Sequence, residues 1–119
     1  MVGVRRLNAM LDPVQSQLDA YNAHDVEDFI ACYGADCLFE DGAGNRLMSG
    51  HAEMRSRYTA LFAASPKLHC ELVQRIRIGL YVIDEEQISG RVPAMNRAVV
   101  IYRVENGLIQ HVRFLRENS

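Results

Sequence analysis

The sequence has no tryptophan, only three prolines and eight glycines, and a single lysine, Lys67. So little glycine and proline excludes a collagen-like or low-complexity chain. No uninterrupted apolar run is longer than that of residues 98–102, which is far short of the roughly 20 residues that a membrane-spanning helix needs. The net charge is −2 with both signs interspersed, which argues against nucleic-acid and membrane-surface partners.

Cysteine is also scarce. Cys32, Cys37 and Cys70 form no C-x-x-C pair and leave an odd cysteine over. The simplest interpretation is three free, mostly buried thiols in a reducing compartment. Residues 1–10 lack the apolar stretch of a signal peptide, so we expect a cytoplasmic protein.

The residues that are present suit one globular domain. A chain of 119 residues with 49% hydrophobic residues can bury a core without a metal or a disulfide. We expect this domain to span residues 1–119, with residues 1–11 as a loosely ordered extension.

Three stretches contain helix signals. Asp12-Pro13 supplies an N-cap followed by proline at the first helical position, and apolar residues then recur at helical spacing. Asp25 can cap a second helix over residues 26–33. A third helix is expected to begin near Gly50 and to end at Ser65-Pro66.

The remaining segments alternate in the manner of strands, and Asn106-Gly107 between two apolar runs is a strong hairpin signal. Helices on one face of an antiparallel sheet define an α+β fold. A strongly curved sheet covered by helices would leave a blind, cone-shaped pocket for a small molecule. The expected strands are residues 37–41, 47–48, 68–78, 81–90, 97–104 and 108–115.

Alternation also predicts which way some strand residues face. Glu85 and Glu86 are interpreted as a solvated segment, or as ion-pair partners of a neighbouring arginine, rather than as catalytic groups. The candidate partners are Arg75, Arg77 and Arg97. Within residues 68–78, one face is expected to hold Leu72, Gln74, Ile76 and Ile78, and the other Glu71, Val73, Arg75 and Arg77.

No pattern predicts a metal, nucleophile or phosphate site. His24, His51, His69 and His111 are scattered without zinc-site spacing. There is no G-x-S-x-G motif, and the stretch Gly42-Ala-Gly44 is too short to cradle a phosphate. We therefore expect no metal and no cofactor.

Two neighbouring carboxylates end the first expected strand. Asp41 shares parity with Cys37 and Phe39, so it is expected to face the interior, and Glu40 the outside. A carboxylate at the rim of an apolar cavity can act as a general base, because desolvation raises its pKa. Alternatively, Asp41 has only a structural role, in which its side chain opens the Asp-Gly turn by hydrogen bonds to the local backbone. Spacing alone favours this second interpretation.

One amide and several aromatic residues complete the candidates. Gln17 lies on the apolar stripe of the first expected helix, where it either bonds to backbone or faces a polar corner of a pocket. Aromatic residues on helix faces are more often core than ligand contacts. Together, however, the aromatic side chains offer flat surface for a small hydrophobic ligand: Tyr21, Phe39, Tyr58, Phe62, Tyr102 and Phe114.

A set of short motifs runs along most of the chain. They are Val14-Gln15, Tyr21-Asn22-Ala23-His24-Asp25, Ala35-Asp36, Phe39-Glu40-Asp41, Met48-Ser49-Gly50 and the stretch 102–109. This set resembles the nuclear transport factor 2-like superfamily, and within it the SnoaL-like polyketide-cyclase and steroid delta-isomerase branches. The resemblance implies a cone-shaped α+β barrel and a homodimer packed through the outer face of the sheet. It is specific for fold rather than function, because this fold hosts enzymes and binding modules alike.

The resemblance also suggests site residues. Ketosteroid isomerase uses an Asp base and an oxyanion hole of Tyr and protonated Asp. The base position corresponds to Asp41, whereas the two donor positions hold Gln17 and Val100. Losing one oxyanion donor costs about 10²–10³ in rate, so efficient ketosteroid isomerase activity is not expected.

Two hypotheses follow. In the first, the protein is an isomerase- or cyclase-like enzyme on a carbonyl compound, with Asp41 as base and Gln17 polarising the carbonyl oxygen. Its ligand-binding wall would be Tyr21, Phe39, Tyr58, Phe62, Val100, Tyr102 and Phe114. In the second, it is a non-catalytic binding or dimerisation module. Convergence of Asp41 and Gln17 on one enclosed cavity discriminates between them.

Overall fold

A computed structural model of the chain describes residues 12–117. The helices in this range are α2 (Pro13–Asn22), α3 (Val26–Ile30) and α4 (Gly50–Ala64). The strands are β1 (Tyr33–Asp41), β2 (Arg46–Ser49), β3 (His69–Ile78), β4 (Tyr81–Ser89), β5 (Arg97–Glu105) and β6 (Leu108–Arg116). This order confirms the predicted sequence of elements. The extension expected for residues 1–11 lies outside the described residues.

The helices start where the sequence places their caps. The side chain of Asp12 accepts a hydrogen bond from the Gln15 amide at 3.2 Å, and that of Asp25 accepts one from the Asp28 amide at 3.0 Å. The second helix ends at Ile30, earlier than predicted, because the chain enters the sheet there. The Cys32 carbonyl accepts a hydrogen bond from the Ile109 amide of β6.

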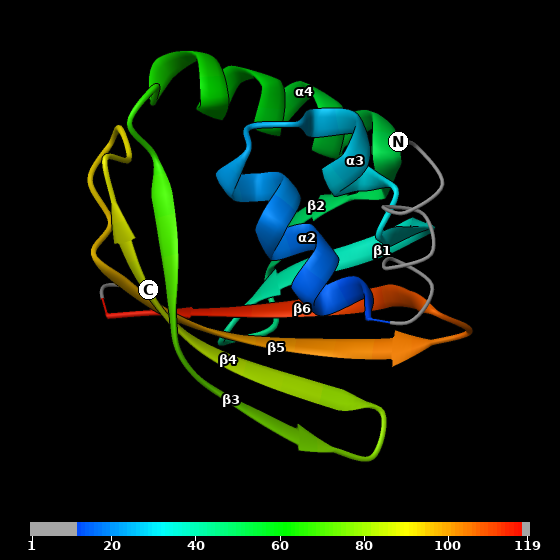
Figure 1. The fold of residues 1–119 in the computed structure, drawn as a ribbon. Coiled ribbons are helices and arrows are strands. Elements are labelled where there is room, and N and C mark those ends of the chain that lie inside the picture. Colours follow the sequence, from blue (N-terminus) through cyan, green and yellow to red (C-terminus); the bar gives the residue numbers. More distant parts are fainter. Residues whose placement is uncertain (1–11, 118–119) are drawn as a thin grey trace.

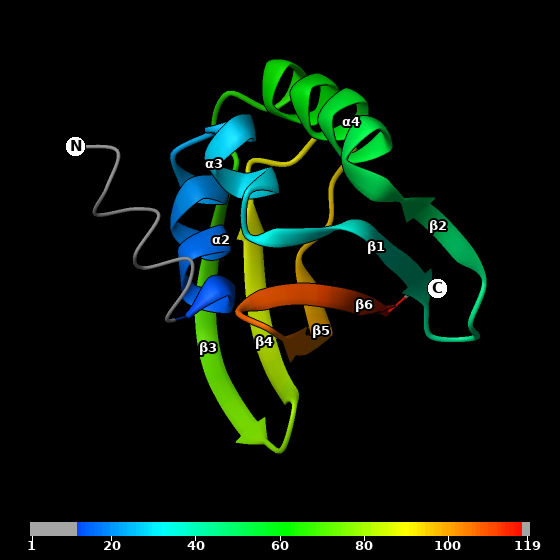
Figure 2. The ribbon, with the colours of Figure 1, turned by 90° about the vertical axis from the view of Figure 1, so that its right-hand side faces the viewer.

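The six strands form one curved, unclosed sheet in the order β2-β1-β6-β5-β4-β3. Strands β3 to β6 form the predicted antiparallel meander, and β1 pairs with β6 in parallel. The sheet is thus antiparallel, as expected, except where β1 pairs with β6. Parallel neighbours need a long connection, and here α4 and the strands between β1 and β6 supply it. The helices cover the concave face (Figures 1 and 2).

The last hairpin confirms its prediction. Asn106 and Gly107 have φ angles of 54° and 75°, as the tight turn between β5 and β6 requires. This turn sets the register in which Val100 faces Phe114 and Tyr102 faces Val112. The same register decides which side chains of β5 and β6 lie on the concave face of the sheet.

Strand β3 departs from strict alternation. Its pairing with β4 shifts register between Leu72 and Gln74, and the extra residue at such a bulge reverses the faces beyond it. Arg75 and Arg77 therefore turn toward α2, whereas Ile76 is 53% exposed. The prediction that Leu72 and Ile76 share a face is wrong for this reason.

The core lies between the concave face of the sheet and the three helices. All three cysteines are buried and free, as predicted, and burial raises the pKa of Cys32 and Cys37 to about 12. Within residues 12–117, no helix combines the length and apolarity needed to cross a membrane. The largest fully buried side chains include Val14, Phe29, Phe39, Met54, Val100, Ile109 and Val112.

Candidate functional site

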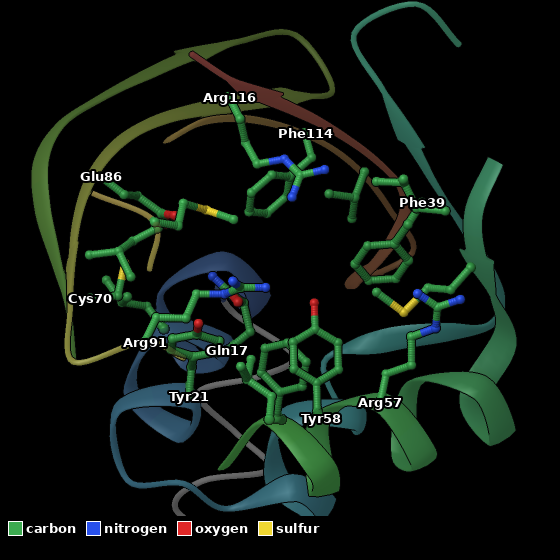
Figure 3. Close-up of a pocket in the computed structure, with 18 of the residues that line it drawn as sticks. Gln17, Tyr21, Phe39, Arg57, Tyr58, Cys70, Glu86, Arg91, Phe114 and Arg116 are labelled. Carbon is green, nitrogen blue, oxygen red and sulfur yellow. The ribbon is translucent and has the colours of Figure 1, made fainter. Parts of the chain in front are cut away.

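A cavity of about 570 Å³ opens between the concave face of the sheet and the helices. This volume is in the range of small-molecule sites. Figure 3 shows side chains from α2, α4 and the strands turned toward one another around it. The wall is mostly apolar and aromatic, with few polar groups. Among the predicted site residues, the wall includes Gln17, Tyr21, Phe39, Tyr58, Tyr102 and Phe114.

Two predicted wall residues belong to the core behind the cavity instead. Phe62 stacks on His24, with ring centroids 5.0 Å apart, and packs edge-on against Tyr21 at 5.4 Å. Val100, a residue of β5, is fully buried. Neither is among the described residues that line the cavity, so the prediction that they face a ligand is corrected.

Asp41 is the main correction, because it does not reach the cavity. Its Oδ1 accepts hydrogen bonds from the amides of Ala43 at 3.0 Å and Asn45 at 2.9 Å, and its Oδ2 accepts one from the Asn45 side chain. These bonds lower its pKa. The pairing of β1 with β2 shifts register between Phe39 and Glu40, just before the turn. Asp41 therefore has the turn role that spacing alone favoured.

Gln17 is buried on the cavity wall, as the sequence suggested, but within a hydrogen-bonded network. Its Nε2 donates to the Val14 carbonyl at 3.0 Å and to the Tyr102 hydroxyl at 3.2 Å. Its Oε1 accepts a hydrogen bond from the Tyr33 hydroxyl at 3.0 Å. Both amide protons are thus engaged, and Gln17 orients Tyr102 rather than presenting a free donor.

The Tyr102 hydroxyl is left with a proton to donate. It accepts from Gln17, and no acceptor for its own proton occurs among residues 12–117. The Tyr58 hydroxyl points into the cavity from α4 (Figure 3). Burial raises the pKa of both phenols above the ordinary value, so they remain protonated donors at neutral pH.

Glu86, on β4, is the only carboxylate among the described residues that line the cavity. It is 5% exposed, and burial together with the nearby charge of Asp84 raises its pKa to about 7. A hydrogen bond with Cys70 and the charge of Arg75 oppose this rise. A carboxyl group with this pKa can both accept and release a proton near neutral pH.

The prediction for the Glu85-Glu86 pair holds for one residue and fails for the other. Glu85 pairs with Arg97 at 3.0 Å, one of the predicted ion pairs. Glu86 lies on the opposite face of β4 and enters the cavity, so its interpretation as a solvated or ion-paired group is wrong. The alternation of Val82, Asp84 and Glu86 on the buried face is the signal that could have found it.

Asp84 lies two residues from Glu86 on the same face and is fully buried. Arg75 on β3 holds it with two hydrogen bonds, at 2.7 and 2.9 Å. A third nitrogen of Arg75 donates to Gln15 on α2 at 2.8 Å. This ion pair ties the sheet to α2 and fixes one charge that acts on Glu86.

Glu40 makes its contacts outside the cavity. Oε1 of Glu40, which was expected to face outward, lies 2.5 Å from Nε2 of His111 and 3.7 Å from Arg113. None of these residues lines the cavity. Within the described part of the chain, no group of three or more His, Cys, Asp or Glu residues is arranged to hold a metal ion.

Comparisons with known proteins agree with this architecture. The sequence model of the SnoaL-like domain family matches residues 14–112. No curated protein matches the sequence. A cystatin-fold protein of uncharacterised function from Novosphingobium aromaticivorans has a similar structure. The TM-score is 0.79 and the identity 24%, over 90% of this chain and 97% of that one.

Two further solved structures have enzyme names. A proposed polyketide cyclase from Sinorhizobium meliloti has a TM-score of 0.74 and 20% identity, over 87% of this chain and 93% of that one. A proposed ketosteroid isomerase from Kribbella flavida has a TM-score of 0.71 and 16% identity, over 94% of this chain and 80% of that one. At such identities the likeness establishes the fold alone.

Proposed function

The chain belongs to the SnoaL-like family, and we propose that it is an enzyme that moves a proton at a carbon alpha to a carbonyl group. The observation on which this rests is Glu86, a buried carboxylate on the wall of an apolar cavity with a pKa of about 7. The proposal keeps the isomerase- or cyclase-like reaction class and replaces Asp41 by Glu86 as the base. The names of the two enzyme-like structural neighbours support the same class.

The proposed step begins with ionised Glu86. Its carboxylate takes the proton from the alpha carbon, and the electron pair of the broken C–H bond forms a carbon–carbon double bond. The π electrons of the carbonyl group move onto its oxygen, which becomes an enolate. Where a second carbon–carbon double bond is conjugated with the enolate, return of the proton from Glu86 to the gamma carbon completes an isomerisation. In D₂O the proton on Glu86 is replaced by a deuteron from solvent, and transfer of that deuteron to the alpha carbon completes an exchange.

The enolate oxygen needs hydrogen-bond donors, and two tyrosines are placed to supply them. Tyr102 has a proton without an acceptor among residues 12–117, and the Tyr58 hydroxyl points into the cavity. Such donors in a water-poor site contribute strongly to rate. Gln17 acts as a positioning residue, because its Nε2 holds the Tyr102 oxygen at 3.2 Å.

The wall indicates the shape of the substrate. Tyr21, Phe39 and Phe114 present aromatic surface to the cavity, which suits a flat apolar molecule. The three free, buried thiols support the cytoplasm as its compartment.

Deuterium exchange tests this function directly. Purified protein is incubated in D₂O with 2-tetralone, a flat ketone with acidic alpha protons, and deuterium uptake is followed by mass spectrometry. We expect the protein to accelerate exchange and Glu86→Gln to abolish the acceleration, whereas Asp41→Asn, outside the cavity, retains it. Binding of 2-tetralone without accelerated exchange would instead favour a non-catalytic ligand-binding module.

A further inference from the structure

Many arginines within residues 12–117 have a guanidinium nitrogen within 4.0 Å of a carboxylate oxygen, among them Arg55, Arg75 and Arg97. Three arginines, Arg57, Arg91 and Arg116, line the cavity. Of these, Arg57 and Arg91 have no carboxylate partner within residues 12–117. Two cations without such a partner thus lie where a ligand would bind.

Arg91 is the best placed of the three. It is partly buried, and Figure 3 shows its guanidinium group turned into the cavity. Its Nη1 donates to the Pro93 carbonyl at 2.6 Å, which fixes the side chain and leaves the other nitrogens available. The Val92 amide donates to the buried Ser65 hydroxyl at 2.9 Å, so the loop is tied to the end of α4.

Gly90 adds to this placement. Its φ angle is 72°, and a Cβ there would lie 2.1 Å from the Lys67 carbonyl oxygen. Only glycine allows this close approach of the backbone to the segment after α4. Gly90 therefore fixes the position of the backbone just before Arg91.

The charge of the cavity is opposite to that of the whole chain. The chain has a net charge of −2, whereas the charged residues on the described cavity wall are three arginines and Glu86. Positive groups along low-dielectric walls focus an attractive field on an anion. A guanidinium group also matches the planar shape of a carboxylate, to which it can donate two parallel hydrogen bonds.

From this arrangement we propose that the substrate of the proposed reaction is a flat, apolar molecule with a carboxylate group, and that Arg91 binds this carboxylate. Arg57 and Arg116 add positive charge on other parts of the wall. This inference rests on the proposed function, since it names the substrate class of that same cavity.

Arg91 and Glu86 line the same cavity, Glu86 from within β4 and Arg91 from the loop that follows it. Both charges act on the tyrosines of the helix side: Arg91 lowers the pKa of Tyr21 and Tyr58 and Glu86 raises it, with burial as the larger cause.

Binding of an unreactive pair of probes tests the inference without any turnover. The probes are 2-naphthoate and 2-acetylnaphthalene, which have similar shape and differ in charge, and isothermal titration calorimetry measures their affinity. We expect 2-naphthoate to bind the protein about tenfold more tightly or better, as a charge-assisted hydrogen bond allows. Arg91→Gln should reduce this preference to within about twofold.

Arg55→Gln is the matched control. Arg55 lies on α4 in an exposed ion pair with Glu27, so the variant removes the same charge outside the cavity and should keep the preference. Equal binding of the two probes, or an unchanged preference in Arg91→Gln, would overturn the inference. The deuterium exchange of neutral 2-tetralone tests the proposed function separately, so the two failures are distinguishable.

Discussion

Asp41 and Glu86 are both acidic side chains on strands of the curved sheet, and their surroundings give them opposite chemistry. Backbone and side-chain donors of the turn surround Asp41 and lower its pKa. Burial and the negative charge of nearby Asp84 raise the pKa of Glu86 to about 7. Strand parity and the family resemblance together made Asp41 the candidate base, because neither shows how many hydrogen-bond donors meet a residue.

Glu86 should make stability and activity depend on pH in opposite directions. Its pKa is raised from 4.5 to about 7, so its stabilising contribution is complete below about pH 4.5 and is lost as pH rises through 7. At pH 8 the loss is about 3 kcal/mol, at about 1.4 kcal/mol per pKa unit.

Glu86→Gln removes this titration. Urea unfolding should therefore show the variant to be more stable than the natural protein at pH 8, with the difference vanishing near pH 4. Exchange catalysis by the natural protein should rise through pH 7, as the base ionises. Parallel pH profiles of stability for the two proteins would contradict the assignment.

Tyr102 is predicted to stabilise the enolate. Tyr102→Phe removes the proposed donor and should lower the rate of deuterium exchange about 10²- to 10³-fold, the usual effect of one oxyanion donor. Tyr81→Phe is the control, since Tyr81 is 45% exposed and does not line the cavity. A rate for Tyr102→Phe within threefold of the natural protein would exclude this role.

Single shifts in register decide which residues of a strand reach the cavity or the helices. Helix caps and the Asn106-Gly107 turn were predictable, because their signals are local. The shift in β3 between Leu72 and Gln74 was not, since it depends on contacts with β4 and α2. It turns Arg75 toward Asp84, and the sequence contains no local sign of it.

The ion pair that results is predicted to stabilise the contact between β3, β4 and α2. Arg75→Met leaves fully buried Asp84 without its partner, which should cost about 3–5 kcal/mol in the free energy of unfolding. The double variant Arg75→Met with Asp84→Leu should recover much of this loss, because the buried charge is gone. Chemical denaturation measures all three proteins. A loss below 1 kcal/mol in the single variant would show that the ion pair contributes little to the free energy of unfolding.

Over the whole molecule, the order of elements and the α+β class followed from sequence patterns, whereas the base did not. Glu86 faces the cavity because β4 lies inside a curved sheet, with β3 on one side and β5 on the other. The parallel pairing of β1 with β6 joins segments far apart in the chain, and local patterns do not specify it. Long-range pairing therefore accounts for the missed parallel pair, whereas the alternation of Val82, Asp84 and Glu86 in β4 was a local sign of the missed site residue.

The outer face of the sheet supports the predicted homodimer, which we propose to form there. Ile76 and Ile78 are 53% and 65% exposed, and pairing places Ile83 and Ile101 beside them on that face. A patch of this kind is typical of an interface between copies of one chain.

Native mass spectrometry tests the dimer. We expect a dimer for the natural protein and a monomer for Ile101→Asp, because a buried charge at the interface is strongly unfavourable. Ala52→Asp, which adds the same charge on exposed α4, should remain dimeric. A monomeric natural protein at micromolar concentration would contradict the proposed interface.

The titration of Glu86 itself tests the proposed base most directly. Carbon-13 NMR of protein labelled at the glutamate side-chain carboxyl, recorded from pH 3 to pH 9, follows every glutamate at once. We expect one resonance that titrates near pH 7 and is missing in Glu86→Gln. If every glutamate of the folded protein titrates below pH 5, Glu86 is an ordinary carboxylate and the cavity has no base of the proposed kind.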